Sequence, residues 1–322
     1  MKEFAKPIVI VSKCLGFANC RYNGLTISDE FVDQLRSFVE FRPVCPELEI
    51  GLGVPRDPVR IVSVAGELKL MQPATNKDLT EPMLGFVHSF LTSLQEVDGF
   101  ILKYRSPSCG LKDIKVYPGT GKVASRGKAK GFFGGAVAEK FPYLAVEDEG
   151  RLRNFRIREH FLTRLFTLAN FRKVKVAHAM KELVRFHSEN KLLLMAYNQT
   201  QLRILGRIVA NPEKKPVGEL VRDYEEQLSK ALLRTPKYTS NINILLHALG
   251  YFSKSLSHSE KAFFLETIEK YRTGTIPLSV NINLLKAWII RFDKQYLRQQ
   301  TFFEPYPEAL MAITDSGKGR DL

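Results

Sequence analysis

The chain has 322 residues, of which 44% are hydrophobic, so it is long and apolar enough for two globular domains. No apolar run approaches the roughly 18 residues of a membrane span, and the short apolar stretch between Lys6 and Lys13 lacks the cleavage site of a secretory signal. We therefore expect a cytoplasmic protein without a membrane segment. In that reducing compartment the four cysteines are expected to be metal ligands, reactive thiols or inert buried residues rather than disulfides.

The formal net charge of +14 is distributed unevenly along the chain. Residues 1–150 contain 19 Lys and Arg against 18 Asp and Glu, together with every cysteine, whereas residues 151–322 contain 29 against 16. A strongly basic region beside a neutral one suggests a polyanionic partner such as a nucleic acid. The alternative is a solvated basic surface that binds nothing, because such surfaces are common on globular proteins.

Strand-like and helix-like segments alternate within residues 1–150. This alternation predicts an α/β domain with a mainly parallel sheet. Ser28 and Thr80 are candidate N-caps of helices whose apolar residues recur at helical spacing. Buried-type runs predict strands at 7–12, 41–44, 99–104 and 141–147, and a hairpin is expected over 59–71. The Gly- and Lys-rich residues 116–135 are expected to form a loop, and the acidic residues 147–150 a linker between domains.

Beyond residue 150 the apolar residues recur at three-to-four spacing, which predicts an all-α helical domain over 151–322. Ser257 and Glu260 have the spacing of a capping box, and Gly274 fits a helix stop. The expected helical segments are 152–190, 199–211, 216–234, 239–255, 257–272 and 277–299.

Three of the cysteines follow predicted strands. Cys14 comes after the first, Cys45 after the second, and Cys109 after the strand that ends near residue 104. Because parallel strands end at one edge of their sheet, these thiols should converge where open α/β sheets bind ligands. No Cys-x-x-Cys pair is present, so spacing alone is weak evidence for a metal.

Short motifs surround these cysteines, and others lie in the second half of the chain. In the first half they are Ser12-Lys13-Cys14, Arg21-Tyr22-Asn23-Gly24, Val44-Cys45-Pro46-Glu47, Gly51-Leu52, Pro55-Arg56 and Ser106-Pro107-Ser108-Cys109-Gly110. In the second half they are Phe186-His187, the run from Lys191 to Ala196, Leu205-Gly206-Arg207, Asn243, His247, Gly250-Tyr251, Tyr271-Arg272, Pro277-Leu278 and Tyr296-Leu297. The first set resembles the bacterial thiouracil desulfidase domain, and the second resembles the YbgA-like helical domain fused to it in two-domain tRNA 4-thiouridine desulfidases. The resemblance covers nearly the whole chain and departs from the family pattern at Leu15-Gly16-Phe17, where Leu-Leu-Gly is usual.

The resemblance implies a 4Fe-4S cluster bound by Cys14, Cys45 and Cys109, with one iron left open for a thiolated pyrimidine. The implied reaction is a non-redox, hydrolytic removal of sulfur that releases sulfide. Glu47 is the candidate general acid/base, with a structural carboxylate paired to Arg56 as the alternative.

Two neighbouring residues have competing interpretations. Ser106 is the candidate for orienting substrate or water, with loop hydrogen bonding as the alternative. Cys20 is expected to be a spare thiol near the site; as a fourth ligand it would close the cluster, a pattern more common in electron transfer.

The expected macromolecular partner is tRNA, bound through the basic half. The alternatives are a desulfidase of free thiouracil or thiouridine, and a non-catalytic iron–sulfur or RNA-binding regulator. His187 and His247 lie among apolar residues, so we expect hydrogen-bonding roles more than catalytic ones. The candidate RNA-binding residues are Arg172, Lys173, Lys175, Lys181, Arg185 and Arg272.

Overall fold

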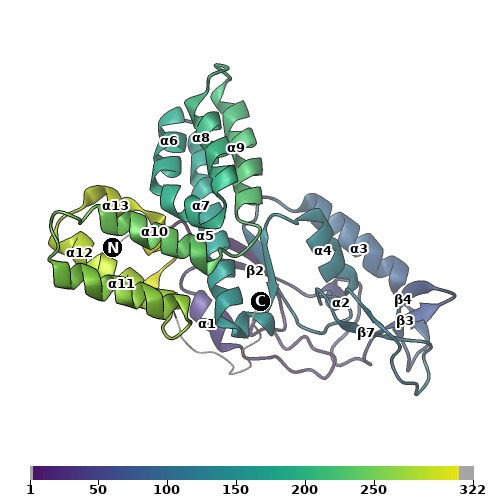
Figure 1. Cartoon of the computed structure of the whole chain (residues 1–322). Helices are drawn as coiled ribbons and strands as arrows, with labels where there is room; N and C mark the ends of the chain where they lie inside the picture. The colour runs from purple at the N-terminus through teal and green to yellow at the C-terminus, as the bar shows by residue number, and fades with distance from the viewer. Residues whose placement is uncertain (1–2, 312–322) are drawn as a thin grey trace. The chain divides into compact units, whose positions relative to one another are not determined.

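The computed structural model describes residues 3–311 and divides into two compact units. The first unit runs through Ala169 and takes in the chain from Pro307, and the second comprises Asn170–Tyr306. Figure 1 shows strands and helices mixed in the first unit and helices throughout the second. The predicted order, a mainly parallel-sheet α/β domain followed by an all-α domain, is confirmed.

A four-stranded parallel sheet with the order β2-β1-β6-β9 forms the centre of the first unit. A second sheet, ordered β5-β4-β3-β7-β8, contains the predicted hairpin, in which Ala65 and Gly66 turn the chain with φ angles of 50° and 88°. The strands are β1 (Ile8–Ser12), β2 (Glu40–Val44), β3 (Arg60–Val64), β4 (Glu67–Gln72), β5 (Lys77–Asp78), β6 (Gly99–Leu102), β7 (Ile114–Tyr117), β8 (Lys128–Ala129) and β9 (Ala145–Asp148).

Helices cover both faces of the parallel sheet. The apolar faces of α3 and α4 share one core with the β1 and β6 side chains Ile10, Phe100 and Leu102. On β6, Gly99 leaves no room for a side chain, because a Cβ there would meet Leu165 of α5 at 2.9 Å and the backbone of β9 at 2.5 Å. The helices of this unit are α1 (Glu30–Leu35), α2 (Pro46–Glu49), α3 (Thr80–Ser93), α4 (Phe132–Lys140) and the first part of α5 (Phe155–Ala177), with 3-10 turns at Arg151–Arg153 and Glu308–Leu310.

Several local expectations for the first unit were wrong. The predicted loop over 116–135 contains the end of β7, all of β8 and the start of α4. The acidic residues expected to form a linker instead end β9, where Asp148 and Glu149 are only 1% and 5% exposed. Asp29, rather than Ser28, caps α1, and Leu79 rather than Thr80 precedes α3. These errors share a cause, since backbone packing and burial override local composition.

The second unit contains the rest of α5 and the helices that follow it. The predicted continuous helix over 152–190 is interrupted at His178, whose φ of 48° is left-handed. The helix α7 was not expected, and the predicted segment 277–299 divides at Asp293, with a φ of 47°. The helices are α6 (Met180–Glu189), α7 (Lys191–Tyr197), α8 (Gln199–Ala210), α9 (Val217–Ala231), α10 (Tyr238–Gly250), α11 (His258–Arg272), α12 (Leu278–Arg291) and α13 (Gln295–Gln299), with a 3-10 turn at Thr301–Phe303.

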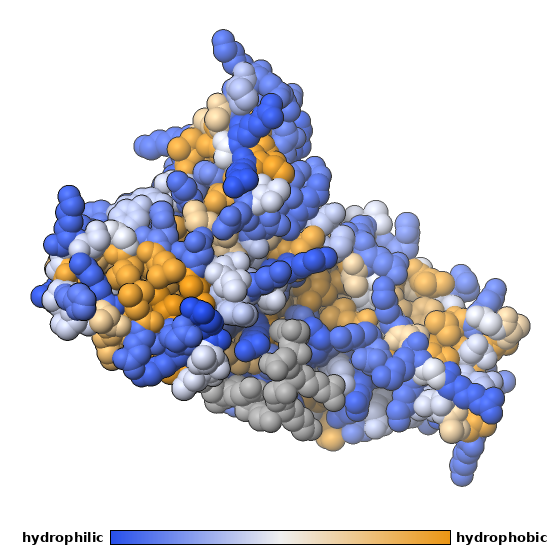
Figure 2. Space-filling model, viewed as in Figure 1, coloured by the Kyte–Doolittle hydropathy of each residue, from blue (hydrophilic) through white to orange (hydrophobic). Residues whose placement is uncertain are grey.

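The core of the second unit gathers apolar residues of α7 and α10 to α13 around Phe252, Phe264 and Trp288. The predicted capping box is present, with Ser257 and Glu260 bonding each other's backbone N–H at the start of α11. Figure 2 shows hydrophobic side chains gathered over α10 to α12, where Leu246, Phe263 and Ile290 are exposed. Within residues 3–311, no helix is both long and apolar enough to cross a bilayer.

Candidate functional site

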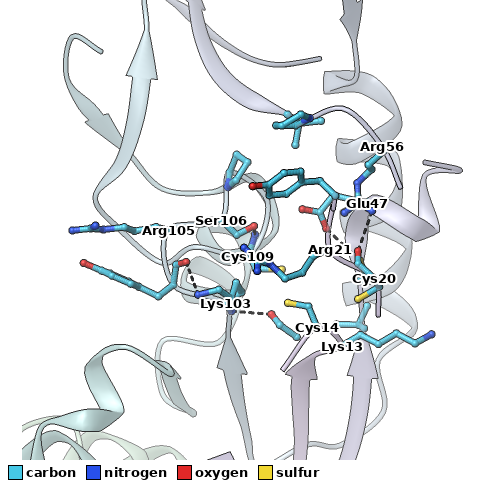
Figure 3. A pocket seen from close by; sticks show the side chains of 18 residues that line it. Lys13, Cys14, Cys20, Arg21, Glu47, Arg56, Lys103, Arg105, Ser106 and Cys109 are labelled. Carbon is cyan, nitrogen blue, oxygen red and sulfur yellow. Dashed lines mark hydrogen bonds between the residues drawn. The ribbon is translucent and has the colours of Figure 1, made fainter. Parts of the chain in front are cut away.

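A cavity of about 410 Å³ opens at the carboxyl ends of β1, β2 and β6. The three predicted cysteines, Cys14, Cys45 and Cys109, line it together with Cys20, and all four are free thiols (Figure 3). Strand direction explains the convergence, because β1 pairs in parallel with both β2 and β6. The structure therefore brings the predicted cysteines together and adds the one that was expected to be spare.

The loop that carries Cys14 is a tight turn built on Gly16. Gly16 has a φ of 82°, and a Cβ there would lie 2.9 Å from Nη2 of Arg36, which donates to the Gly16 carbonyl at 2.9 Å. Thr26 accepts from the Gly16 N–H at 3.2 Å and donates to the Cys14 carbonyl at 3.0 Å. Because glycine adopts a left-handed conformation without steric cost, the departure from Leu-Leu-Gly still yields an ordered turn.

Cys45 lies directly before the short helix α2, in which Glu47 is buried. The Cys45 thiol donates to Oε2 of Glu47 at 3.4 Å. Arg56 forms no ion pair with Glu47 in the described structure; its Nη1 donates instead to the carbonyls of Cys20 at 3.0 Å and Gly53 at 3.3 Å. Glu47 is the only carboxylate among the described residues that line the cavity. The carboxylate is thus placed beside a thiol, and the guanidinium fixes the Cys20 loop.

The loop that carries Cys109 is held by backbone contacts on two sides. Ser106 Oγ accepts from the N–H groups of Ser108 and Cys109 at 3.2 and 3.0 Å, which is the loop role considered for Ser106. The first turn of α4 approaches so closely that a Cβ on Gly134 would lie 2.3 Å from the Cys109 carbonyl. The N–H groups of Phe133 and Gly134 donate to the Ser108 carbonyl at 2.9 and 3.0 Å. Residues predicted as loop therefore clamp a candidate ligand.

The four thiols affect one another because they are close and buried. Cys20 forms hydrogen bonds with Cys14 and with Cys45, and the bond to Cys14 is the main reason that the pKa of Cys20 is raised to about 11. The bond to Cys20, followed by burial, raises the pKa of Cys45, and burial above all raises the pKa of Cys109. The raised pKa values favour the protonated thiols of Cys20, Cys45 and Cys109, so a metal that binds Cys45 and Cys109 must displace their protons.

This donor set suits an iron–sulfur cluster better than a single ion. Iron–sulfur clusters prefer thiolate ligands. The cavity contains four thiols, one more than the three that the expected cluster requires. Within the described residues, no group of three or more His, Cys, Asp or Glu side chains has the arrangement of a single-ion site. A cluster differs from one ion in that each cysteine binds a different iron, so its ligands stand farther apart. The residues present fit the expected group.

Cations surround the cavity, although residues 1–150 are nearly neutral as a whole. Lys103 is paired with Glu149, and Figure 3 shows Lys13 and Arg105 directed away from the sulfur atoms. The sequence analysis did not predict these cations as site residues. Lys13 directly follows β1 and Lys103 directly follows β6, and this position after a strand is the signal that could have identified them. The Lys and Arg residues that line the cavity are Lys13, Arg21, Arg56, Lys103 and Arg105.

The candidate RNA-binding cations all lie in the second unit, and half of them are paired with carboxylates. Lys175 contacts Glu225 at 2.6 Å, and Arg272 contacts Glu269 at 2.9 Å. Arg185 is paired with Glu182. Lys173 and Lys181 are exposed, and Arg172 is half-buried. Because ion pairing compensates part of their charge, the short basic stretch is less available to phosphates than its sequence suggests.

The two histidines occupy different settings. His187 Nδ1 lies 3.1 Å from the hydroxyl of buried Tyr224, and burial lowers the pKa of His187. His247 is exposed and stands against Tyr251, with ring centroids 5.7 Å apart. Neither histidine lines the described cavity. The hydrogen-bonding role expected for His187 is therefore present, whereas His247 is a surface residue.

Comparisons with known proteins match the two halves separately. A family model described as 2-thiouracil desulfurase matches residues 9–149 and therefore contains the cavity. A relative, the uncharacterized protein YbbK of Bacillus subtilis (strain 168), is 34% identical over 110 residues, which span 32% of this chain and 73% of that protein. The chain belongs to the 2-thiouracil desulfurase family. This member carries an additional helical region, since residues 191–307 match a model described as a protein of unknown function, DUF1722.

Two further matches accompany the family assignment. The uncharacterized protein YbgA of Escherichia coli (strain K12) is 25% identical over 158 residues, which span 48% of this desulfurase-family chain and 93% of YbgA. A solved structure of a 4Fe-4S-dependent thiouracil desulfidase, TudS, is 26% identical and covers 46% of this chain and 93% of its own, with a TM-score of 0.36.

Proposed function

We propose that this protein is an iron–sulfur-dependent desulfidase that removes sulfur from thiolated uracil, with 4-thiouridine in tRNA as its substrate and uridine and hydrogen sulfide as products. One observation carries the proposal. Four thiols and one carboxylate line a single cavity at the carboxyl ends of parallel strands, in a chain of the 2-thiouracil desulfurase family.

Cys14, Cys45 and Cys109 are proposed to bind a 4Fe-4S cluster with one open iron. Bound there, the cluster would supply a Lewis-acidic iron suited to the soft sulfur of a thione. Each ligand comes from a separate, well-fixed loop, and Arg56 holds the Cys20 loop beside them. Cys20 remains a neighbouring thiol, which keeps the number of protein ligands at three.

Glu47 is proposed to handle the protons of the reaction. Hydrolysis replaces the ring C=S by C=O; the water supplies the oxygen, both of its protons leave with the sulfur as hydrogen sulfide, and no electron is gained or lost. A carboxylate in the cavity can take a proton from the attacking water and return it to the departing sulfur. The contact of Glu47 with the Cys45 thiol and its lack of an ion pair with Arg56 in the described structure leave it available for that task.

Ser106 is proposed to orient substrate or water only secondarily. Its Oγ already accepts two backbone hydrogen bonds within the Cys109 loop. The hydroxyl hydrogen remains to be donated, so Ser106 can still present one donor to a ligand in the cavity. We expect its main contribution to be the position of Cys109.

The tRNA substrate is supported by charge in both parts of the chain. The cavity is lined by Lys and Arg with Glu47 as the only described carboxylate, which suits a base that arrives with its phosphates more than a neutral free base. Residues 151–322 carry 29 Lys and Arg against 16 Asp and Glu, which supports phosphate contacts by the helical region. Lys173 and Lys181 are the exposed members of the candidate set without a carboxylate partner in the described structure.

The test is anaerobic reconstitution of the full chain followed by mass spectrometry of tRNA nucleosides. We expect 4-thiouridine to be converted to uridine with release of sulfide. The double variant Lys173→Gln/Lys181→Gln should weaken tRNA binding and flatten its log–log salt slope by about 0.7–0.9 per phosphate contact. Lys175→Gln, which removes an ion-paired lysine, is the matched control and should change both less.

Activity on free 4-thiouracil separates the alternatives. Unchanged turnover of the free base in the double variant supports a division between chemistry and RNA binding. Equal activity on tRNA before and after removal of the two charges, with no salt dependence, would favour the free-base enzyme. A reconstituted cluster without turnover on either substrate would favour a regulator.

A further inference from the structure

One segment of the helical unit contains no acidic residue over an unusual length. Glu226 and Glu260 flank 33 residues without Asp or Glu, whereas Lys and Arg occur there four times. Arg234, Lys237 and Lys254 are exposed and enter no ion pair in the described structure. Helix α10 lies within this segment. It therefore has basic residues, and no acidic residues, close to it in the sequence.

An exposed aromatic cluster lies at the end of α10. The rings of Tyr251 and Tyr296 are stacked, with centroids 5.6 Å apart and planes 21° apart. His247, one turn before Tyr251, meets it edge to face at 5.7 Å. Figure 1 shows α10 beside α13, the helix that carries Tyr296. Tyr251 is 39% exposed, whereas the large aromatic residues of the core of this unit are nearly inaccessible.

The two tyrosines form a fixed pair rather than two mobile side chains. Tyr296 packs on the core of the unit through its partly buried ring. Burial, and then the interaction with Tyr251, raise the pKa of Tyr296, as expected for a ring packed closely against its neighbour. Tyr251 is thereby held at the surface in one orientation, with Lys254 three residues further along the chain.

Fixed aromatic rings beside cations are the combination that binds unpaired nucleotides. A nucleobase stacks on an aromatic ring, and the adjacent lysine contacts the phosphate. Within residues 227–259 no carboxylate repels phosphate, and Asp293, near Tyr296, is paired with Arg298 at 2.9 Å. A protein partner would find hydrophobic side chains on α10 to α12, but it would derive no benefit from a run of unpaired cations.

We propose that the α10 surface, defined as His247, Tyr251, Tyr296 and Lys254, binds unpaired nucleotides of RNA by base stacking and phosphate contact. The inference rests on the proposed function in that RNA is the partner. It adds a base-stacking contact on α10 and α13 to the phosphate contacts proposed for Lys173 of α5 and Lys181 of α6. Stacking tolerates any base, so the surface recognises single-stranded character rather than sequence.

The test measures binding of the full-length protein to a decamer of oligouridine and to a duplex RNA of equal length, by fluorescence anisotropy at several salt concentrations. Tyr251→Ala should weaken oligouridine binding between about fivefold and a hundredfold while leaving the salt slope unchanged, because stacking releases no counterions. Tyr251→Phe should bind within about twofold of the parent, since the ring is kept. Lys254→Gln should flatten the slope by about 0.7, as expected for one single-strand phosphate contact.

Tyr143→Ala, which removes a tyrosine that is 42% exposed in the first unit, is the matched control and should bind like the parent. Thermal unfolding of every variant establishes that the fold is kept. Equal loss of binding in Tyr251→Phe and Tyr251→Ala, or equal loss for duplex RNA, would overturn the proposal. So would dissociation of a dimer by Tyr251→Ala without a change in RNA affinity, which would assign the surface to a second copy of the chain.

The binding assay needs neither the cluster nor a thiolated base. Loss of oligouridine binding in Tyr251→Ala together with absent desulfurisation would support the surface and reject the proposed function. Normal desulfurisation of tRNA with unchanged oligouridine binding would do the reverse.

Discussion

The two halves of this chain differ in where their chemically informative residues lie. In the first unit the cysteines and Glu47 are buried or half-buried around one cavity, on loops fixed by strand ends and tight glycine contacts. In the second unit the informative residues are exposed charges and aromatic rings on helices. Short motifs located the first kind of site, because strand ends determine where buried side chains converge. For the second kind of site a count of charges is less informative, because ion pairs within and between helices compensate several of the cations.

Substitution of the thiols in the first unit should have the largest effect on the protein. Cys45→Ser should abolish both the brown colour of the reconstituted protein and all desulfurisation, because a hydroxyl does not replace a thiolate as a ligand of iron. Cys14→Ser and Cys109→Ser should do the same, whereas Cys20→Ser should keep the cluster. Iron and acid-labile sulfide analysis measures the outcome. Loss of the cluster in Cys20→Ser with retention in one of the other three would reassign the ligands.

Glu47→Gln tests whether the cavity supplies a proton as well as ligands. We expect an unchanged cluster spectrum and a fall in turnover of about 10²–10⁴-fold, the range of a general acid/base. Single-turnover kinetics on free 4-thiouracil and on tRNA should show the same loss, since we propose that the first unit performs the chemistry in both reactions. A loss smaller than about tenfold would assign Glu47 a structural role beside Cys45.

Substitution of one glycine in each unit tests how much close backbone contact contributes to the stability of the two regions. Gly134→Ala should destabilise the protein by about 3 kcal/mol, because the new Cβ would meet the Cys109 and Gly110 carbonyls and backbone atoms have little room to move. Gly250→Ala, at the end of α10, is the matched change in the helical unit, where a Cβ meets nothing within 4 Å.

Gly250→Ala should be neutral or stabilising by up to about 1 kcal/mol, since alanine favours a helix. Urea unfolding monitored by circular dichroism measures both variants. Equal stability of the two variants would show that α4 does not clamp the Cys109 loop.

The smallest expected effect on stability comes from carboxyl groups, and it depends on pH. Burial is the main reason that the pKa of Asp148, at the end of β9, is raised to about 6. In Glu260 of α11, hydrogen bonds from Ser257 lower the pKa. For a carboxyl group with a raised pKa, the native state binds the proton more tightly, so stability is lost as pH rises from about 4 to about 6.

Asp148→Asn should remove that loss while keeping an acceptor for the Arg151 N–H. The variant should equal the parent near pH 4 and exceed it by at most roughly 3 kcal/mol at pH 7. Unfolding curves across this pH range test the sign. A variant that is less stable than the parent at every pH would show that Asp148 stabilises the fold in its ionised form.

The mainly parallel sheet and the meeting of the cysteines were predictable because both depend on hydrophobic patterning and on the direction of parallel strands. The helix α4 was not, since Gly131, Gly134 and Gly135 lower its local helix propensity and its reason for folding lies in the distant Cys109 loop. The breaks at His178 and Asp293 depend on left-handed residues that the apolar spacing does not reveal. The pairing of Lys175 with Glu225, fifty positions apart, likewise needs the fold of the second unit.

The clamp on the Cys109 loop has a consequence for assembly of the metal centre. The Ser108 and Cys109 amides already donate to Ser106 Oγ, and the Ser108 carbonyl accepts from the first turn of α4. The loop therefore has little conformational entropy left to lose when iron arrives. The Phe133 and Gly134 amides should accordingly be among the slowest to exchange with deuterium in the protein without metal, with rates that change little on reconstitution. Cys14 is the most exposed of the three proposed ligands, so the exchange of its loop amides should slow most on reconstitution, when a bound cluster would cover them from solvent.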